Sequence, residues 1–299
     1  MDRLTGMSVF VSAVDEGSLI SAARRHGLSA SMAGKHVAAI ESELNVRLIQ
    51  RTTRSLALTE AGRAYYLRCR RILEEYDEAR REAGEAHQQI RGNLRVAAPV
   101  TYGTLYLADI MASFLDQHPG VALEVILSDR YVDVVGEGID VAIRIGALPD
   151  SDLIAKRLAP CRMILCASRK LLDRIGTPVT VEELRRLPRL IFSDAVSTSD
   201  WTLVDSEGRA HTVDGPVRMS ANNMQMLLGA ALRGCGITYG PSFVFAAHLQ
   251  SGELVPLLPD YRTPDLTIHA VYPTTRHVPL KLRAFLDHLA ASLGPAPRR

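Results

Sequence analysis

The stretch that decides the fold is residues 18–59, SLISAARRHGLSASMAGKHVAAIESELNVRLIQRTTRSLALT. Ser18 can cap a helix that runs to His26, because its hydroxyl oxygen can accept hydrogen bonds from the N–H groups of the first helical turn. Gly27 is predicted to end that helix, since glycine tolerates the positive φ of a helix stop. The first part of the stretch therefore predicts one short helix followed by a tight turn.

The residues after this turn predict a second helix. Either Ser29 or Ser31 can act as its N-cap, and Asn45 is suited to the left-handed conformation that ends a helix. Hydrophobic residues recur on one face at i, i+3 and i+7: Val37, Ile40 and Leu44. The basic segment RTTR at 51–54 then predicts a β-hairpin. Two short helices joined by a glycine-containing turn are typical of the helix-turn-helix unit, whose second helix enters the DNA major groove.

Positive charge is concentrated in the same part of the chain. Residues 18–71 contain ten Lys or Arg against three Asp or Glu, whereas the whole chain has a formal net charge of only +2. A local excess of this kind is what a phosphate-binding surface requires. A solvated basic face on an ordinary helix pair would show the same charge, but the helix-turn-helix pattern beside a basic hairpin favours DNA binding.

A long uninterrupted helix is predicted after Thr59, whose side chain can cap it. An unbroken heptad pattern runs along it: Tyr65, Cys69, Ile72, Tyr76, Ala79, Ala83, Ala86 and Ile90. One alternative is a helix that packs only on its own domain. A narrow apolar stripe on a rod of about 45 Å more often pairs with a second copy of itself, so we expect a linker and dimerisation helix over 60–91.

Composition excludes several other classes of protein. The 299 residues allow two or three domains, and no apolar run approaches the roughly 20 residues needed to span a bilayer. The first residues, MDRLTGMSVFVSAVDEG, lack the apolar core of a signal peptide. The four cysteines form no CxxC pair, which favours reduced thiols and leaves open whether one of them is redox-active. We therefore expect a cytoplasmic protein without a membrane segment.

After Gly92 the pattern changes to strands that alternate with helices. The predicted strands are 94–100, 121–127, 140–145, 163–168, 190–192, 236–240, 254–258 and 266–272. The predicted helices are 103–118, 132–137, 181–186, 222–233, 242–249 and 279–293. Strands separated by helices are typical of βαβ units, and they predict an α/β domain with a parallel sheet over 92–299.

Several residues at the carboxyl ends of these strands are candidate ligand contacts, because open α/β sheets bind ligands there. The candidates are Pro99, Val100, Thr101, Ser128, Asp129, Arg130, Arg144, Asn222 and Pro241. Helix starts predicted at 103, 222 and 242 would aim N–H groups at the same crevice and favour an anion. Taken singly, each residue fits equally well as an ordinary cap or turn residue.

The sequence carries no recognisable catalytic motif. It has no HExxH and no P-loop, its nine histidines lack metal-ligand spacing, and GPSFV at 240–244 lacks the last glycine of a nucleophile elbow. We expect no enzyme activity, no metal and no cofactor. Two alternatives remain: an enzyme or solute receptor with an appended basic domain, and an architectural DNA-binding protein without a ligand.

Six segments together resemble the LysR-type transcriptional regulators, and the resemblance covers nearly the whole chain. They are GSLISAARRHGLSASMAGKHVAAIESELNVRL, RTTRSLALTEAGRAYY, LRVAAPVTYG, SDRYVDVVGEGIDVAIRIG, AALRGCGITYGPSF and RHVPLKLRAFLDHL. The resemblance implies three parts: a winged helix-turn-helix over 1–59, a linker helix over 60–91, and an effector domain over 92–299. This last domain would be a two-lobed α/β domain like the periplasmic binding proteins, with lobe one at 93–160 and 269–299 and lobe two at 161–268.

The resemblance also assigns residues to DNA. It places the recognition helix at about Ala30–Glu41, and the residues that it implies at the DNA are Ala30, Ser31, Gly34, Lys35, Arg51, Thr52 and Arg54. The last three would lie at the wing. Gly34 departs from the family, which commonly has Ser or Thr there, so this chain lacks a hydroxyl at that point. Glycine also costs up to ~1 kcal/mol inside a helix.

The implied partners are double-stranded DNA, a small-molecule effector, RNA polymerase and further copies of the chain, as a homodimer or homotetramer. We expect the effector to be an organic anion, such as an aromatic carboxylate, hydrogen-bonded by Thr101 and neutralised by Arg130 or Arg144. The alternative is that these arginines pair with internal acids, which would leave a mostly neutral pocket; the nearest in sequence are Asp129, Asp133 and Asp140.

Overall fold

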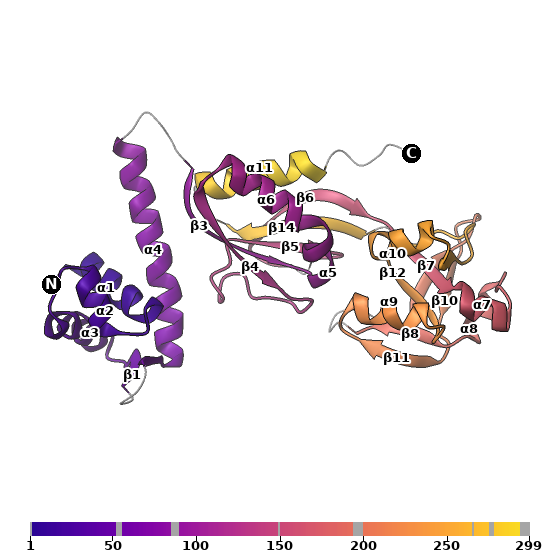
Figure 1. Ribbon diagram of the computed structural model, residues 1–299, viewed down its shortest axis with the longest axis horizontal. Coiled ribbons are helices and arrows are strands. Elements are labelled where there is room, and N and C mark those ends of the chain that lie inside the picture. The colour runs from indigo at the N-terminus through magenta and orange to yellow at the C-terminus, as the bar shows by residue number, and fades with distance from the viewer. Residues whose placement is uncertain are drawn as a thin grey trace. The chain divides into compact units, whose positions relative to one another are not determined.

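The computed structural model describes residues 2–51, 56–84, 90–148, 150–193, 200–264, 266–274 and 278–293. Its contacts divide the chain into two compact units (Figure 1). The first unit comprises residues 1–92 with 133–139, and the second comprises residues 93–132 with 140–299. After the functions that the resemblance implies, we call them the DNA-binding unit and the effector unit.

The DNA-binding unit contains the helices and hairpin that the sequence predicts, preceded by one further helix. Its elements are α1 (Arg3–Asp15), α2 (Leu19–Arg25), α3 (Ala30–Leu44), β1 (Ile49–Arg51), β2 (Leu56–Leu58) and α4 (Glu60–Gly84). Ser18 caps α2 by accepting from the N–H groups of Ile20 and Ser21. Ser29, rather than Ser31, caps α3. Asn45 ends α3 with a left-handed φ of 51°.

Two apolar clusters hold these helices together. The main core contains six buried side chains: Phe10, Val37, Ile40, Leu48, Ile49 and Cys69. Val9, Ala23 and Ala33 form a second, smaller cluster. Tyr65 packs against the main core, with its ring centroid 5.6 Å from that of Phe10. The first turns of α4 therefore pack on the domain from which the helix emerges.

This packing corrects part of the predicted dimerisation seam. Cys69 has 0% of its surface exposed within one chain, so it belongs to the core of the DNA-binding unit and its assignment to the seam is wrong. Ile72 and Tyr76, by contrast, are 42% and 44% exposed. The side chains of Ala79 and Ala83, and the whole of Ala86, lie outside the described residues. Ile90 is not helical and directly precedes the strand β3 (Arg91–Ala98), so its place in the predicted helical seam is wrong.

The first lobe of the effector unit is a five-stranded sheet with helices. Its strands are β3 (Arg91–Ala98), β4 (Gly120–Leu127), β5 (Val141–Ile145), β6 (Leu153–Cys161) and β14 (Leu266–Pro273). Its helices are α5 (Val100–Tyr102), the π-helical turn η1 (Gly103–Leu107), α6 (Ala108–Gln117) and α11 (Leu280–Leu293). The strand order is β4-β3-β5-β14-β6. β3 and β5 are parallel, whereas β14 runs antiparallel to both β5 and β6.

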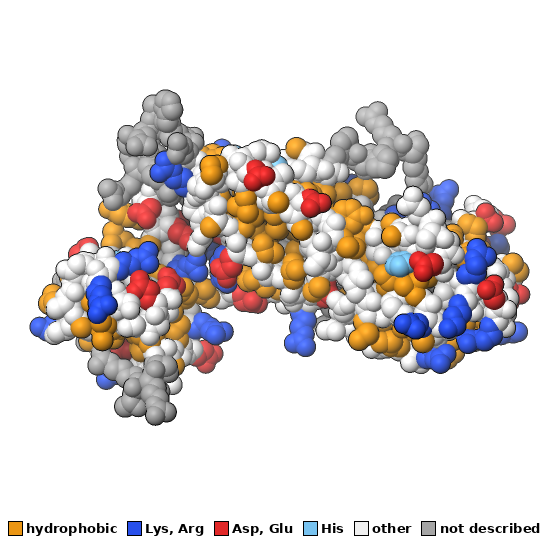
Figure 2. Space-filling view, in the orientation of Figure 1, with side chains coloured by type: hydrophobic (Ala, Val, Ile, Leu, Met, Phe, Trp, Pro, Cys, Tyr) orange, Lys and Arg blue, Asp and Glu red, His pale blue; other side chains and the backbone are white. Residues whose placement is uncertain are grey.

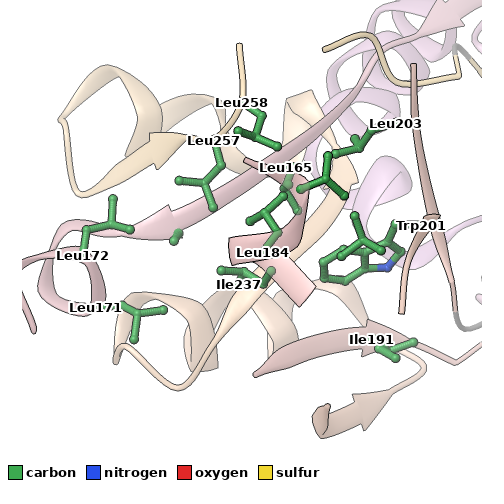
Figure 3. Packing of buried hydrophobic residues seen from close by; sticks show 13 residues of the cluster. Leu165, Leu171, Leu172, Leu184, Ile191, Trp201, Leu203, Ile237, Leu257 and Leu258 are labelled. Atoms are coloured by element: carbon green, nitrogen blue, oxygen red, sulfur yellow. The ribbon is translucent and has the colours of Figure 1, made fainter. Parts of the chain in front are cut away.

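The second lobe is another five-stranded sheet, of order β11-β8-β12-β7-β13, with a separate two-stranded hairpin. Its strands are β7 (Met163–Ser168), β8 (Arg189–Phe192), β9 (Trp201–Val204), β10 (Ala210–Val213), β11 (Val217–Ala221), β12 (Ile237–Pro241) and β13 (Leu254–Pro256). Its helices are α7 (Arg169–Ile175), α8 (Val181–Arg185), α9 (Met224–Leu232) and α10 (Ser242–Gln250). Figure 3 shows how Trp201 and Leu203 of the hairpin pack beside Leu165 and Leu184 in its core.

Four expectations are corrected here. Both large sheets are mixed rather than parallel, because β14, β7 and β13 make antiparallel pairs. Residues 132–137 form no helix: hydrogen-bonded turns span 134–138, ended by Gly138 at a φ of +64°. The first helix after β3, which was predicted to start at residue 103, starts at Val100. The predicted lobe boundary at 268/269 falls inside β14, all of which pairs within the first lobe.

Candidate nucleic-acid interface and effector site

The recognition helix α3 presents the predicted DNA-facing residues to solvent. Ala30, Ser31 and Lys35 are exposed and Gly34 is partly exposed, whereas the opposite face of α3 packs into the core. The described residues offer Lys35 no ion-pair partner. A lysine in that position is available to a phosphate or a base edge.

The wing is only partly described. Strands β1 and β2 pair antiparallel, with Arg51 opposite Leu56. The side chain of Arg51 and the whole of Thr52 and Arg54 lie outside the described residues, so their predicted DNA contacts stay predictions.

A buried carboxylate joins the recognition helix to the wing. Glu41, 8% exposed, accepts the N–H groups of Leu48 at 2.8 Å and Ile49 at 3.1 Å, and its other oxygen lies 3.0 Å from Arg47 Nη1. Burial by itself raises the pKa of Glu41, but the two N–H groups and the Arg47 guanidinium outweigh it and lower the pKa. Glu41 therefore fixes the position of the start of β1 relative to α3. The sequence analysis did not assign this structural role to Glu41. The role could have been inferred from the position of an acidic residue on the apolar face of the predicted helix.

Two hydroxyl groups are buried at the start of α5. Thr101 and Tyr102 are 4% and 3% exposed, and neither Thr101 Oγ1 nor the Tyr102 hydroxyl has a hydrogen-bond partner among the described residues. Burial, and to a lesser degree the nearby Cys161, raises the pKa of Tyr102 to about 12. Buried polar groups in proteins are nearly always paired, so these two hydroxyls are available to a ligand or to water.

Aromatic side chains from both lobes pack against the ring of Tyr102. The rings of Tyr102 and Tyr106 stack at 5.6 Å, and Phe243 of α10 meets them edge-on at 5.3 and 5.4 Å. Tyr106 is 41% exposed and Leu105 beside it 49%. Figure 2 shows that hydrophobic side chains gather on the visible face of the effector unit. The predicted contact Pro241 ends β12, immediately before α10.

Some of the N–H groups at the expected helix starts are already occupied by side chains. Asp129 Oδ1 accepts the Val100 N–H at 2.9 Å, at the start of α5. Asn223, rather than the predicted Asn222, caps α9, and its Oδ1 accepts from the N–H groups of Gln225 and Met226. Asn222 is exposed. These bonds take one N–H group of α5 and two of α9. The third expected helix start, that of α10, has no side-chain cap, and its Ser242 N–H donates to the carbonyl of Arg162 at 2.8 Å.

Arg144 also has a structural role. Its guanidinium donates to the carbonyls of Val132 at 2.7 Å and Arg130 at 3.3 Å, and its Cζ lies 4.2 Å from the ring centroid of Tyr131. Arg144 thus holds the segment after Ser128 and Asp129 in place. Arg130 is exposed, and its backbone N–H donates to Ser128 Oγ at 3.1 Å.

Other features of the described residues add no second site. An open hollow of about 520 Å³ lies in the second lobe beside Arg169 and Glu253, and no predicted contact residue lines it. The described part of the chain contains no cluster of His, Cys, Asp and Glu suited to a metal ion. No helix in that part is both long and apolar enough to cross a membrane.

Comparison with known proteins identifies this arrangement. The family model described as "LysR substrate binding domain" matches residues 87–294, and that described as "Bacterial regulatory helix-turn-helix protein, lysR family" matches residues 4–63. The chain belongs to the LysR family of transcriptional regulators. Regulators of this family bind DNA and small-molecule effectors and form oligomers.

The similarity to individual relatives extends over almost the whole chain. The transcriptional activator AaeR of Escherichia coli is 33% identical over 289 residues, which are 97% of this chain and 93% of AaeR. The regulator CrgA of Neisseria meningitidis is 34% identical over 290 residues, 96% of each chain. These relatives are named as regulators of transcription and not as enzymes, in agreement with the expectation from the sequence that the chain is a regulator and not an enzyme.

Solved structures agree with the fold. The structure of CrgA has a TM-score of 0.62 at 33% identity and covers 97% of this chain and 98% of its own. The full-length virulence activator AphB of Vibrio cholerae has a TM-score of 0.61 at 28% identity, over 97% and 99% of the two chains. The predicted fold class, a helix-turn-helix domain followed by a two-lobed α/β domain, is thereby confirmed.

Proposed function

We propose that this LysR-family regulator responds to a small organic acid bound between the two lobes of its effector unit. The observation that carries the proposal is Thr101 Oγ1, a buried hydroxyl without a partner among the described residues. It can donate a hydrogen bond to a ligand carboxylate, and Arg130 at the neighbouring loop can supply the counter-charge. The rings of Tyr102, Tyr106 and Phe243 favour an aromatic body on that acid.

The proposed contacts to DNA rest on the exposed face of α3. Lys35 and Ser31 would contact the major groove, and Arg51, Thr52 and Arg54 would follow the backbone from the wing. The exposed Ile72 and Tyr76 on α4 would pair two chains, so that two recognition helices read half-sites about one helical turn apart, roughly 34–36 Å. The regulator would act in the cytoplasm, as a dimer or tetramer, on transcription by RNA polymerase.

A thermal-shift screen of the full-length protein tests the effector assignment. Benzoate and phenylacetate are expected to raise the melting temperature, whereas glucose and spermidine are expected to leave it unchanged. The variant Thr101→Val keeps the shape of the side chain and removes the hydroxyl, so it should lose most of the stabilisation by the acids, because a charge-assisted hydrogen bond contributes about 1.5–3 kcal/mol. Thr104→Val, which removes an exposed hydroxyl on the same segment, is the matched control.

Two results would contradict the proposal. If only cations or neutral sugars stabilise the protein, the ligand is not an organic acid. If stabilisation by the acids survives Thr101→Val unchanged, the pocket lies elsewhere. Mapping of bound chromosomal sites would then add the operator sequence and the genes beside it.

A further inference from the structure

Tyr102 carries the second buried hydroxyl at the start of α5. The residue is 3% exposed, and its hydroxyl has no hydrogen-bond partner among the described residues, the nearby sulfur of Cys161 included. The hydroxyl of a buried tyrosine usually finds a partner. The proposed function gives a ligand contact to Thr101 but none to this second hydroxyl.

The hydroxyls of Thr101 and Tyr102 leave the chain in different directions. The two residues are consecutive in α5, and consecutive side chains of an α-helix diverge by about 100°. Side chains that diverge in this way are suited to two different groups of one ligand rather than to a single carboxylate. If Thr101 binds the acid group, Tyr102 is left for another part of the same molecule.

The surroundings of Tyr102 are apolar. Its ring stacks on that of Tyr106 at 5.6 Å, and the ring of Phe243 from the second lobe stands edge-on at 5.3 Å. Burial, Cys161 and Tyr106 raise the pKa of Tyr102 to about 12, and no Lys or Arg in the described part of the chain is among the groups that shift it. The hydroxyl is therefore protonated at neutral pH and can donate, whereas a charged group beside it would lack a counter-charge.

We infer that the effector is a substituted aromatic acid, whose ring carries a second, neutral group with a hydrogen-bond acceptor, such as a carbonyl oxygen, that the Tyr102 hydroxyl binds. This inference rests on the proposed function, because it takes Thr101 as the contact to the acid group. Tyr102 is then a specificity-determining residue. An unsubstituted acid such as benzoate still binds through Thr101, but more weakly, because it leaves the buried hydroxyl unpaired.

Isothermal titration calorimetry of the full-length protein tests this inference with matched pairs of acids. The pairs are meta-acetylbenzoate with meta-isopropenylbenzoate, and the two corresponding para compounds; in each pair a carbonyl oxygen replaces a methylene group of similar size. In the wild-type protein the ketone should bind about tenfold more tightly than the alkene at one or both ring positions. In Tyr102→Phe, which keeps the ring and removes the hydroxyl, this ratio should fall about fivefold.

Two further variants separate this contact from the acid contact. Thr101→Val should weaken both members of a pair by the same factor and leave their ratio unchanged, because the acid group is common to them. Tyr261→Phe removes the hydroxyl of a half-buried tyrosine that packs on another core of the second lobe, and it should change neither the affinities nor the ratio. A purely structural role of the Tyr102 hydroxyl would weaken ketone and alkene equally.

The outcomes distinguish this inference from the proposed function. Equal affinity of the wild-type protein for ketone and alkene at both ring positions overturns the role of Tyr102, even if Tyr102→Phe does not fold. A ratio that Tyr102→Phe leaves unchanged overturns it too, while the organic-acid assignment stands. If no acid of the series binds the wild-type protein, the proposed function is wrong and this inference falls with it.

Discussion

The DNA-binding unit and the effector unit present their polar groups in opposite ways. On α3 the residues predicted to contact DNA are open to solvent, and Lys35 has no ion-pair partner among the described residues. At the candidate effector site, the Val100 N–H and Arg144 are engaged by the protein, and the hydroxyls of Thr101 and Tyr102 are buried. Exposed cations can bind a polyanion such as DNA. A small ligand is instead bound by polar groups that the protein has already removed from water.

The largest effect is expected from breaking the buried link that shapes the DNA-binding surface. Glu41→Ala leaves the N–H groups of Leu48 and Ile49 without their acceptor, and each unsatisfied buried group costs about 1–3 kcal/mol. We expect the DNA-binding unit to lose about 2–4 kcal/mol of its free energy of unfolding. Hydrogen exchange of α3 and β1 in the full-length protein measures this loss.

A conservative change and a change of pH refine that prediction. Glu41→Gln keeps an oxygen for both N–H groups and should cost clearly less than Glu41→Ala. Because the folded protein lowers the pKa of Glu41, the stabilisation is fully present above its unfolded value of 4.5 and is lost as the pH falls through the lower folded value. Equal protection of α3 in wild type and Glu41→Ala at neutral pH would show that Glu41 does not hold the wing.

A second test acts on the surface of α4 that we propose pairs two chains. In such a pair Ile72→Glu would place two carboxylates face to face in a partly dry seam, so we expect dissociation to monomers at micromolar concentration. Analytical ultracentrifugation measures the assembly state, and Arg68→Glu, an exposed change on the same helix, is the control. An intact dimer of Ile72→Glu would mean that α4 does not pair through its exposed stripe.

An intermediate effect is expected from the exposed cation on α3. Lys35→Ala should weaken operator binding by about 1–3 kcal/mol if Lys35 contacts a base, or lower the salt dependence by about one counter-ion if it contacts a phosphate. Gel-shift titrations at two salt concentrations distinguish the two contacts. Lys170→Ala, an exposed lysine of the effector unit, should have no effect. Unchanged affinity and unchanged salt slope for Lys35→Ala would remove Lys35 from the interface.

The smallest effect is expected at Gly34 on the same helix. Gly34→Ala should raise the free energy of unfolding by up to ~1 kcal/mol, because alanine has less backbone freedom to lose in a helix than glycine. Urea unfolding measures the gain, and operator affinity should stay within a factor of a few. A large loss of affinity would instead show that the DNA backbone approaches Gly34 too closely for a methyl group.

The sequence predicted the DNA-binding unit better than the effector unit, and the reason is locality. Ser18, Gly27, Ser29 and Asn45 act within a few residues of themselves, so their caps and stops can be read from the chain. Strand direction in the effector unit depends on partners far away in sequence, such as β14 with β5 and β6. A parallel sheet was therefore predicted where the structure has mixed ones.

The candidate effector site shows the same limit at the level of single residues. Thr101 and Asp129 were correctly brought to one end of the sheet by the rule for open α/β sheets. That Asp129 would accept the Val100 N–H, and that Arg144 would donate to the carbonyls of Arg130 and Val132, depends on side-chain directions that no spacing encodes. Cys69 was wrongly assigned to the dimerisation seam for a related reason. The heptad pattern of a helix is the same whether the apolar stripe packs on its own domain or on a second chain.

Two of the three buried cysteines, Cys69 and Cys166, can serve as native reporters of local unfolding. Burial raises the pKa of Cys69 in the DNA-binding unit to about 11 and that of Cys166 in the second lobe to about 12. Alkylating reagents attack thiolates, so neither sulfur should react until its own surroundings open. The rate of labelling at each cysteine, read by mass spectrometry, would give the opening of each unit separately in one intact chain. An effector that tightens only its own unit would then slow labelling at Cys166 and leave that at Cys69 unchanged.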